Sequence, residues 1–235
     1  MSAPETLAVA IVGPDGRMGS FARRLIAETP GFELRAEIRR GEDLAGALRK
    51  SRATVALDVT RAGLGFEHAA TMLASGVRPL VGTSGVTPAE NAHLDAMARE
   101  LGLGGLVVPN FSLGMWLLQR AAVEAARHYE RAEIVEMHHE KKKDAPSGTA
   151  LDTAERMRAA REGAARDVPI HSIRLPGLYA HQLVILGSAG ETYTLRHDMS
   201  GPEAFGPGIL RGLRYAAGAV GVGRGIDLAF GADGR

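Results

Sequence analysis

The chain has 235 residues, of which 45% are hydrophobic and 23% charged, a composition typical of globular proteins with one large or two modest domains. Its 28 Lys and Arg residues balance 27 Asp and Glu residues, which argues against a nucleic-acid-binding protein. The absence of cysteine excludes disulfides, thiolate metal sites and cysteine nucleophiles. No signal-peptide pattern or long apolar run is present, so we expect a cytoplasmic protein without a membrane partner.

The first half of the chain alternates strand-like and helical segments. Strands are expected at 7–13, 32–38, 55–60, 78–84 and 105–110, and helices at 18–28, 66–75 and 87–101. Strands that alternate with helices at this spacing predict βαβ units and a parallel sheet. We therefore expect an α/β fold, with a Rossmann-type doubly wound parallel sheet forming a dinucleotide-binding domain over residues 1–112.

The pattern changes after this domain. A helix is expected at 112–129, a strand at 132–139 and a helix at 147–163, followed by strands at 170–175, 181–187 and 191–199. Consecutive strands suggest a C-terminal α+β domain with a mixed or antiparallel sheet, over residues 113–202. A last helix, within 203–221, is expected to return to the first domain. The glycine-rich tail after Gly221 is expected to be loosely held.

The sequence GPDGRMG, Gly13 to Gly19, follows the first expected strand and opens a helix. Glycines in such a turn allow the backbone N–H groups to approach a pyrophosphate at the helix N-terminus. A tight turn without a ligand is the alternative, but the strand–turn–helix context and Arg17 favour a phosphate.

Residues at the end of the second expected strand should contact the adenosine ribose of a bound dinucleotide. Glu37 is suited to the ribose hydroxyls of NADH, whereas Arg39 and Arg40 are suited to the 2′-phosphate of NADPH. The two arginines favour NADPH, with NADH as a second accepted cofactor. The alternative is that both are solvated arginines at a strand end.

Two further polar turns follow expected strands, GTSG at 82–85 and PNFS at 109–112. The carboxyl ends of parallel strands line the ligand crevice of an open α/β sheet, so these turns are suited to contacts with a nicotinamide ring. Asn110 and Ser112 are equally suited to capping the helix that follows, and the two roles are compatible.

The segment EMHHEKKKDAPSGTA, residues 136–150, carries most of the chemistry. Adjacent strand residues point to opposite faces, so His138 and His139 are not expected to act as a pair, and no metal site is expected. The D-A-P-S-G-T turn places residues 147–149 at a helix start, where N–H groups and the helix dipole favour an anion. A histidine and a lysine nearby can exchange protons. These residues indicate a nicotinamide-dependent reductase of a small carboxylated substrate.

Together, GPDGRMG, LDVT, VGTSG, PNFSLG and EIVEMHHEKKKDAPSGTA resemble the 4-hydroxy-tetrahydrodipicolinate reductase (dihydrodipicolinate reductase) family of lysine and diaminopimelate biosynthesis. The matches span about residues 7–210, and the histidine–lysine block is the specific one. The resemblance implies reduction of 4-hydroxy-tetrahydrodipicolinate, a small dicarboxylate, by a hydride from NAD(P)H. It also implies a homotetramer built through the sheet of the second domain, which would bind the substrate.

The resemblance implies roles for individual residues. His138 matches the catalytic acid/base and Lys142 the proton donor, and which of them protonates which atom stays open. The substrate contacts are His139, Ser147, Gly148 and Thr149. The cofactor contacts are Gly13, Pro14, Asp15, Gly16, Arg17, Met18, Arg39, Arg40, Gly82, Thr83, Ser84, Val108, Pro109, Asn110 and Phe111. Lys141 and Lys143 are expected to be solvated charges.

Two other functions stay open at this point. The chain could be another two-domain nicotinamide-dependent amino-acid dehydrogenase, which substrate profiling would identify. It could also be a non-catalytic NADPH-binding sensor, although His138 and Lys142 argue against that. Pro202, in place of an expected arginine, and Leu183, in place of an acid, depart from the family pattern and remove no catalytic candidate.

Overall fold

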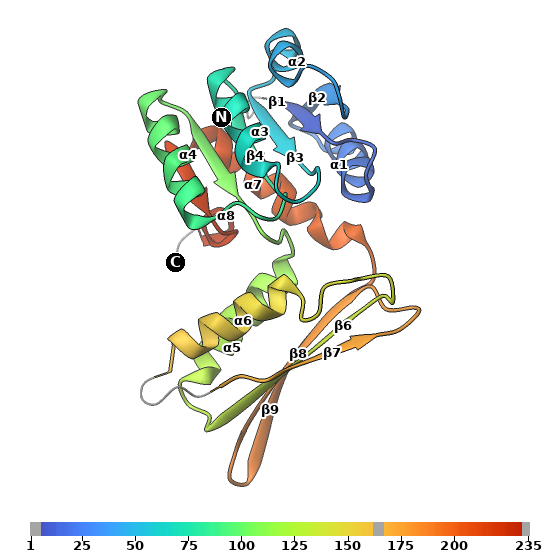
Figure 1. Cartoon of the computed structure of the whole chain (residues 1–235), viewed down its shortest axis with the longest axis vertical. Helices are drawn as coiled ribbons and strands as arrows, with labels where there is room; N and C mark the ends of the chain where they lie inside the picture. The colour runs from blue at the N-terminus through green and yellow to red at the C-terminus, as the bar shows by residue number, and fades with distance from the viewer. Residues whose placement is uncertain (1–5, 162–166, 232–235) are drawn as a thin grey trace. The chain divides into compact units, whose positions relative to one another are not determined.

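The computed structural model describes residues 6–161 and 167–231, which form two compact units (Figure 1). The first unit consists of Met1–Phe111 together with Phe205–Arg235, and the second of Ser112–Ala204. The chain therefore leaves the first unit once and returns to it, so that the second unit is an insertion between two parts of the first.

The first unit contains a parallel sheet of six strands in the order β10-β5-β4-β3-β1-β2. Its strands are β1 (Leu7–Val12), β2 (Phe32–Ile38), β3 (Val55–Asp58), β4 (Arg78–Val81), β5 (Gly104–Val107) and β10 (Gly221–Arg224). This order confirms the doubly wound prediction. Four strands end earlier than expected, at Val12, Asp58, Val81 and Val107, so that the residues beyond them form loops at the carboxyl edge of the sheet.

Helices cover both faces of this sheet (Figure 1). They are α1 (Arg17–Glu28), α2 (Leu44–Ser51), α3 (Gly65–Ala74), α4 (Pro88–Glu100), α7 (Gly206–Gly218) and α8 (Asp227–Gly231). α2 and α3 pack on one face beside α4, and α1 packs on the other with α7 and α8. Every residue of β3 is buried, as expected for a strand covered on both faces.

The prediction of a loosely held tail after Gly221 is wrong for residues 221–231. β10 pairs with β5 as the sixth strand, and the Asp95 carboxylate accepts the N–H of Val222 at 2.8 Å. Phe230 in α8 is buried. Glycine content suggested mobility, but here it permits close packing, since a Cβ at Gly221 would lie 2.2 Å from Asp95 Oδ1. Residues 232–235 of the tail lie outside the described residues.

The second unit contains a mixed sheet in the order β7-β6-β8-β9, covered on one face by two helices that lie side by side (Figure 1). Its elements are α5 (Leu113–Ala126), β6 (Arg131–His138), α6 (Gly148–Ala159), β7 (Ile170–Arg174), β8 (Ala180–Ser188), β9 (Glu191–Met199) and a short 3₁₀ helix, Pro202–Phe205. β6 is parallel to β7 and antiparallel to β8, which confirms the mixed-sheet prediction. Residues 162–163 of the expected helix lie outside the described residues.

Strand alternation in β6 determines which side chains face the helices. Ala132, Ile134 and Glu136 are buried and alternate with more exposed neighbours, and His138 continues the same face. Ile134 belongs to the apolar core that the sheet shares with α5 and α6. The alternation therefore carries one buried carboxylate and the expected catalytic histidine on the inner face of the sheet.

Candidate active site

The turn after β1 is shaped by two glycines. Gly13 has φ +86°, and a Cβ on it would lie 2.8 Å from Cγ2 of Thr60. A Cβ on Gly19, in α1, would lie 2.0 Å from the carbonyl oxygen of Gly13. The helix begins after Gly16, which supplies no side-chain cap to its first N–H groups. The turn thus has the close packing and the uncapped helix start that suit a bound phosphate.

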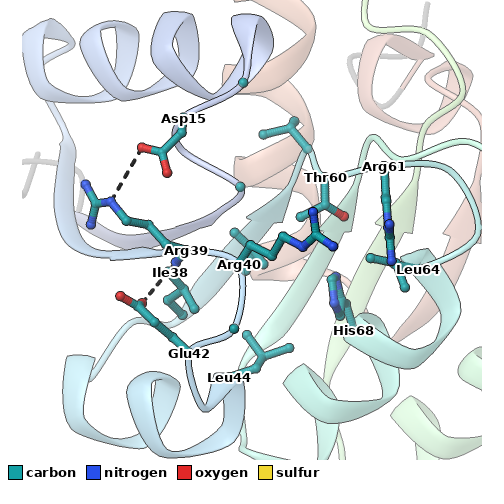
Figure 2. Close-up of a pocket in the computed structure, with 15 residues that line it drawn as sticks. Asp15, Ile38, Arg39, Arg40, Glu42, Leu44, Thr60, Arg61, Leu64 and His68 are labelled. Carbon is teal, nitrogen blue, oxygen red and sulfur yellow. Dashed lines mark hydrogen bonds and ion pairs between the residues drawn. The ribbon is translucent and has the colours of Figure 1, made fainter.

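A cavity of about 430 Å³ lies beside this turn (Figure 2). Its lining follows the carboxyl ends of three parallel strands: Gly13, Asp15 and Gly16 after β1, Arg39, Arg40, Gly41 and Glu42 after β2, and Thr60 and Arg61 in the loop after β3, with His68 from α3. Ligands of open α/β sheets bind at this edge. The volume is in the range of small-molecule and cofactor sites.

The two predicted phosphate-reading arginines have different surroundings. Arg39 pairs with Glu37 at 2.9 Å and with Asp15 at 3.4 Å, and Figure 2 shows its guanidinium turned toward Asp15. The guanidinium groups of Arg40 and Arg61 make no hydrogen bond or ion pair with any residue that the structure describes, and both residues line the cavity. The cations available to a ligand are therefore Arg40 and Arg61, of which the sequence indicated only the first.

The sequence also gave no role to Asp58, a fully buried carboxylate at the end of β3. It accepts hydrogen bonds from the backbone and hydroxyl of Thr60, from the Thr83 hydroxyl at 2.8 Å and from Nδ1 of His68 at 3.0 Å. Burial alone would raise the pKa of Asp58, but the bonds from His68 and Thr60 outweigh it and lower the pKa. The bond to Asp58 raises the pKa of His68 against the effect of burial. The bond to Asp58 therefore favours the protonated, positively charged form of His68 at the cavity wall.

The remaining predicted cofactor segments lie at neighbouring strand ends. The N–H of Val108 donates to the carbonyl of Val81 at 2.8 Å, and a Cβ on Gly82 would lie 2.5 Å from the Phe111 ring. Residues 82–84 and 108–111 are thus brought together. They do not line the cavity, and neither do Pro14, Arg17 and Met18. Ser112 caps α5 by accepting the N–H of Met115, as its position suggested.

In the second unit, His138 lies at the end of β6 with its side chain 16% exposed. Its Nδ1 is 2.5 Å from Oε2 of Glu136, a carboxylate whose side chain is 1% exposed. Burial lowers the pKa of His138, and the positive charges of Lys142 and Arg174 act in the same direction, against the bond to Glu136. The imidazole is therefore largely neutral near neutral pH, and able to exchange a proton.

Lys142 differs from the lysines on either side of it. Its side chain is 22% exposed, and its ammonium group contacts both carboxylate oxygens of Asp144, at 2.9 and 2.7 Å. Hydrogen bonding to Lys142 lowers the pKa of Asp144. Lys141 and Lys143 are exposed, in keeping with the solvated role expected for them. Among the residues that the structure describes, Lys142 is thus the member of the triplet whose ammonium group is held by a carboxylate.

The predicted substrate residues lie at the start of α6. Ser147 is the N-cap: its hydroxyl accepts the N–H of Ala150 at 3.2 Å, and its own N–H donates to Oε1 of Glu136 at 3.3 Å. Gly148 and Thr149 are the first two helical residues, and Gly148 is exposed. His139 is half-buried, and its carbonyl accepts the N–H of Lys142. Glu136 therefore connects the histidine to the helix start, a role that the sequence did not suggest.

Within residues 6–161 and 167–231, no group of three or more His, Cys, Asp or Glu side chains is arranged to hold a metal ion. Among the helices that the structure describes, none is both long and apolar enough to cross a membrane.

A doubly wound sheet with a glycine turn and a cationic cavity at its carboxyl edge is typical of dinucleotide-binding oxidoreductases. Two family models cover most of the chain: "Dihydrodipicolinate reductase, N-terminus" matches residues 7–111 and "Dihydrodipicolinate reductase, C-terminus" matches residues 114–224. The chain belongs to the dihydrodipicolinate reductase family, an NAD(P)H-dependent oxidoreductase family of lysine and diaminopimelate biosynthesis.

Individual relatives agree with this placement. The chain is 41% identical to the 4-hydroxy-tetrahydrodipicolinate reductase of Lactococcus lactis subsp. cremoris (strain SK11), over 88% of this chain and 90% of that protein. It is 42% identical to that of Coxiella burnetii (strain RSA 493), over 88% and 92%. A dipicolinate-bound dihydrodipicolinate reductase from Paenisporosarcina sp. TG-14 superposes with a TM-score of 0.83 at 30% identity, over 94% of this chain and 98% of that one. The dehydrogenase and sensor alternatives are not favoured.

Proposed function

We propose that the chain reduces 4-hydroxy-tetrahydrodipicolinate to tetrahydrodipicolinate, with NADPH as the preferred cofactor and NADH as a second one. The observation that carries the proposal lies between β6 and α6. There a buried carboxylate holds the imidazole of His138, an ammonium group lies on Lys142, and a helix starts at Gly148. Proton transfer and the binding of an anionic group are what a reductase of a dicarboxylate requires.

The residues of the second unit would bind and protonate the substrate. Ser147, Gly148 and Thr149 at the positive end of α6, with His139, would hold a substrate carboxylate. When bound, the nicotinamide supplies the hydride, so that the reaction consumes NADPH and one proton and gives NADP⁺ and water. Lys142 would exchange Asp144 for the substrate, and Lys142 and His138 together would deliver the proton.

The cavity of the first unit supports the preference for NADPH. The guanidinium groups of Arg40 and Arg61 have no partner among the described residues, and the raised pKa of His68 favours its positively charged form beside them. Glu37, which would otherwise bind the ribose hydroxyls of NADH, is paired with Arg39 and Arg23. The 2′-phosphate of NADPH would therefore lie beside positively charged side chains. The ribose hydroxyls of NADH would have to compete with two arginines for the Glu37 carboxylate.

The domain roles and the assembly belong to the same proposal. Residues 1–112, with the helix within 203–221, would bind the dinucleotide, and residues 113–202 would bind the substrate and form a homotetramer in the cytoplasm. One face of the second sheet packs on α5 and α6. The other carries partly exposed apolar side chains: Val135, Met137, Ile173, Leu183 and Ile185. Light scattering coupled to size-exclusion chromatography would measure the assembly, and a monomer would contradict it.

A coupled assay tests the reaction. The cyclic substrate is generated in situ, and the loss of reduced cofactor absorbance is followed with NADPH and with NADH. Oxidation that depends on the substrate, and is faster with NADPH at low cofactor concentration, is expected. No turnover with either cofactor would refute the proposed function, and binding of NADPH without turnover on related substrates would favour a sensor.

A further inference from the structure

A largely buried ion pair joins two strands next to the proposed active site. Glu136 and Arg174 lie on the adjacent strands β6 and β7, and the guanidinium donates two parallel hydrogen bonds to the carboxylate, at 2.9 and 2.7 Å. The side chains are 1% and 17% exposed. A buried pair of this kind often adds little net stability over apolar side chains of similar volume. Its other contacts therefore point to its role.

Two further contacts of the Glu136 carboxylate lead to the proposed site. Oε2 accepts from Nδ1 of His138, and Oε1 accepts from the backbone N–H of Ser147 at 3.3 Å. Burial would raise the pKa of Glu136, but hydrogen bonds from Arg174, Ser172 and His138 outweigh it and lower the pKa. The carboxylate is therefore ionised and can only accept, so that the proton on Nδ1 belongs to His138.

Arg174 extends the same connection to the loop between β6 and α6. Besides the two bonds to Glu136, its Nη2 donates to the carbonyl oxygen of Asp144 at 2.7 Å. Asp144 is the residue that holds Lys142. One ion pair thus contacts the end of β6, the lysine-bearing loop and the N-cap of α6, which are the three segments that carry the proposed proton-transfer and carboxylate-binding groups.

We infer that Glu136, held by Arg174, is a positioning residue for the reduction. It fixes His138 as the Nδ1–H tautomer and so leaves Nε2 for proton exchange. It also holds the start of α6 at a fixed position relative to that imidazole. This inference rests on the proposed function for its kinetic consequences. No hydrogen bond to Nε2 is formed by any residue within 6–161 or 167–231, which leaves that nitrogen for the substrate. The charged groups that act on His138 are Glu136, Lys142 and Arg174.

The kinetic test replaces Glu136 by Gln and uses a matched control on the same strand. Glu133 also accepts from a histidine, His171, at 2.7 Å, but both side chains are more than half exposed. We expect Glu136→Gln to lower kcat about 10²-fold. We also expect it to raise KM for the substrate and to displace the pH profile of kcat/KM, whereas Glu133→Gln should leave all three near wild type. Wild-type kcat and an undisplaced pH profile in Glu136→Gln would overturn the inference.

The tautomer can be measured without turnover. In ¹⁵N-labelled protein, with the His138 resonances assigned by their loss in His138→Asn, we expect the Nδ1–H form in the wild type and a shift toward the Nε2–H form in Glu136→Gln. An Nε2–H wild-type tautomer would overturn the inference, whatever the activity. If the wild type fails to turn over, the proposed function is refuted, but the resonances still decide whether Glu136 orients His138.

Glu136→Gln leaves Arg174 without its carboxylate, and that variant could fail to fold for this reason alone. The double variant Glu136→Gln/Arg174→Gln removes both charges. If the double variant folds and its kcat is lowered as much as we expect for Glu136→Gln, the positioning role is supported. If it folds with wild-type kcat and pH profile, the positioning role is overturned. If neither variant folds, the wild-type tautomer decides.

Discussion

Asp58 and His68 form a hydrogen-bonded pair in which a fully buried carboxylate accepts from the Nδ1 of an imidazole on the cavity wall, at 3.0 Å. The pKa of the carboxyl is lowered and that of the imidazole raised, because each favours the charged form of the other. The pair therefore affects both the stability of the first unit and the charge that a bound nucleotide meets.

Replacement of His68 by Gln should change stability in a pH-dependent way. The folded-state pKa of His68 is raised above 6.5, so its contribution is fully present below about pH 6.5 and is lost as the pH rises through the folded value. The pKa of Asp58 is lowered from 3.8, so its contribution is lost as the pH falls through that lower value. We expect a loss of about 1–2 kcal/mol at pH 6, and less at pH 9. Urea unfolding at both pH values measures it, and equal losses would contradict the pairing.

Replacement of Arg40 by Ala should weaken the binding of NADPH about 10–100-fold and change that of NADH little, because a charged hydrogen bond to phosphate contributes about 1.5–3 kcal/mol. Arg39→Ala is the matched control, since Arg39 is already paired with Glu37 and Asp15. Fluorescence titration with each cofactor gives the dissociation constants. A larger effect at Arg39 than at Arg40 would show that Arg39 changes partners when the nucleotide binds.

Replacement of Lys142 by Ala should lower kcat about 10²–10⁴-fold if its ammonium group delivers the proton. Lys141→Ala removes an exposed neighbour of the same charge and should leave kcat unchanged. The comparison separates proton delivery from the general positive charge of the loop. Equal and small effects in the two variants would assign Lys142 to charge alone.

Replacement of Gly19 by Ala should destabilise the protein by about 1–3 kcal/mol, because the new Cβ would lie 2.0 Å from the backbone carbonyl of Gly13. Gly16→Ala is the control within the same turn: its φ is −71°, and the nearest atom to a Cβ there, Gly13 O, is 3.9 Å away. Thermal denaturation with and without NADPH compares them. If Gly19→Ala unfolds at the wild-type temperature, the close approach of helix and turn is not required.

Most of the fold could be predicted from periodicity. Continuous apolar runs bounded by turns identified the buried strands of the first unit, and T-P-A-E identified the start of α4, where Thr87 and Glu90 form a capping box. β10 was missed because four residues rich in glycine carry no apolar signal of their own. They become a strand only because the edge of β5 is there to pair with them.

The candidate site could be predicted in part. Motif residues such as His138 and Lys142 stand out by type and spacing, but their supporting carboxylates do not. Glu136 has the same parity as Ile134 in an alternating strand, which would have placed it on the buried face. Nothing in the local sequence indicates Arg174, because its role depends on the pairing of β6 with β7, 38 positions apart.

The position of β10 has a consequence for biosynthesis. The sheet of the first unit has β5 paired on both sides, with β4 and with β10, and β10 is translated only after the whole of Ser112–Ala204. During synthesis the outer edge of β5 therefore has no partner while the inserted unit emerges and folds. An unpaired edge strand is a template for wrong pairing. The nascent chain thus carries an unpaired strand edge until residues 221–224, which follow the proposed substrate-binding unit, have been synthesised.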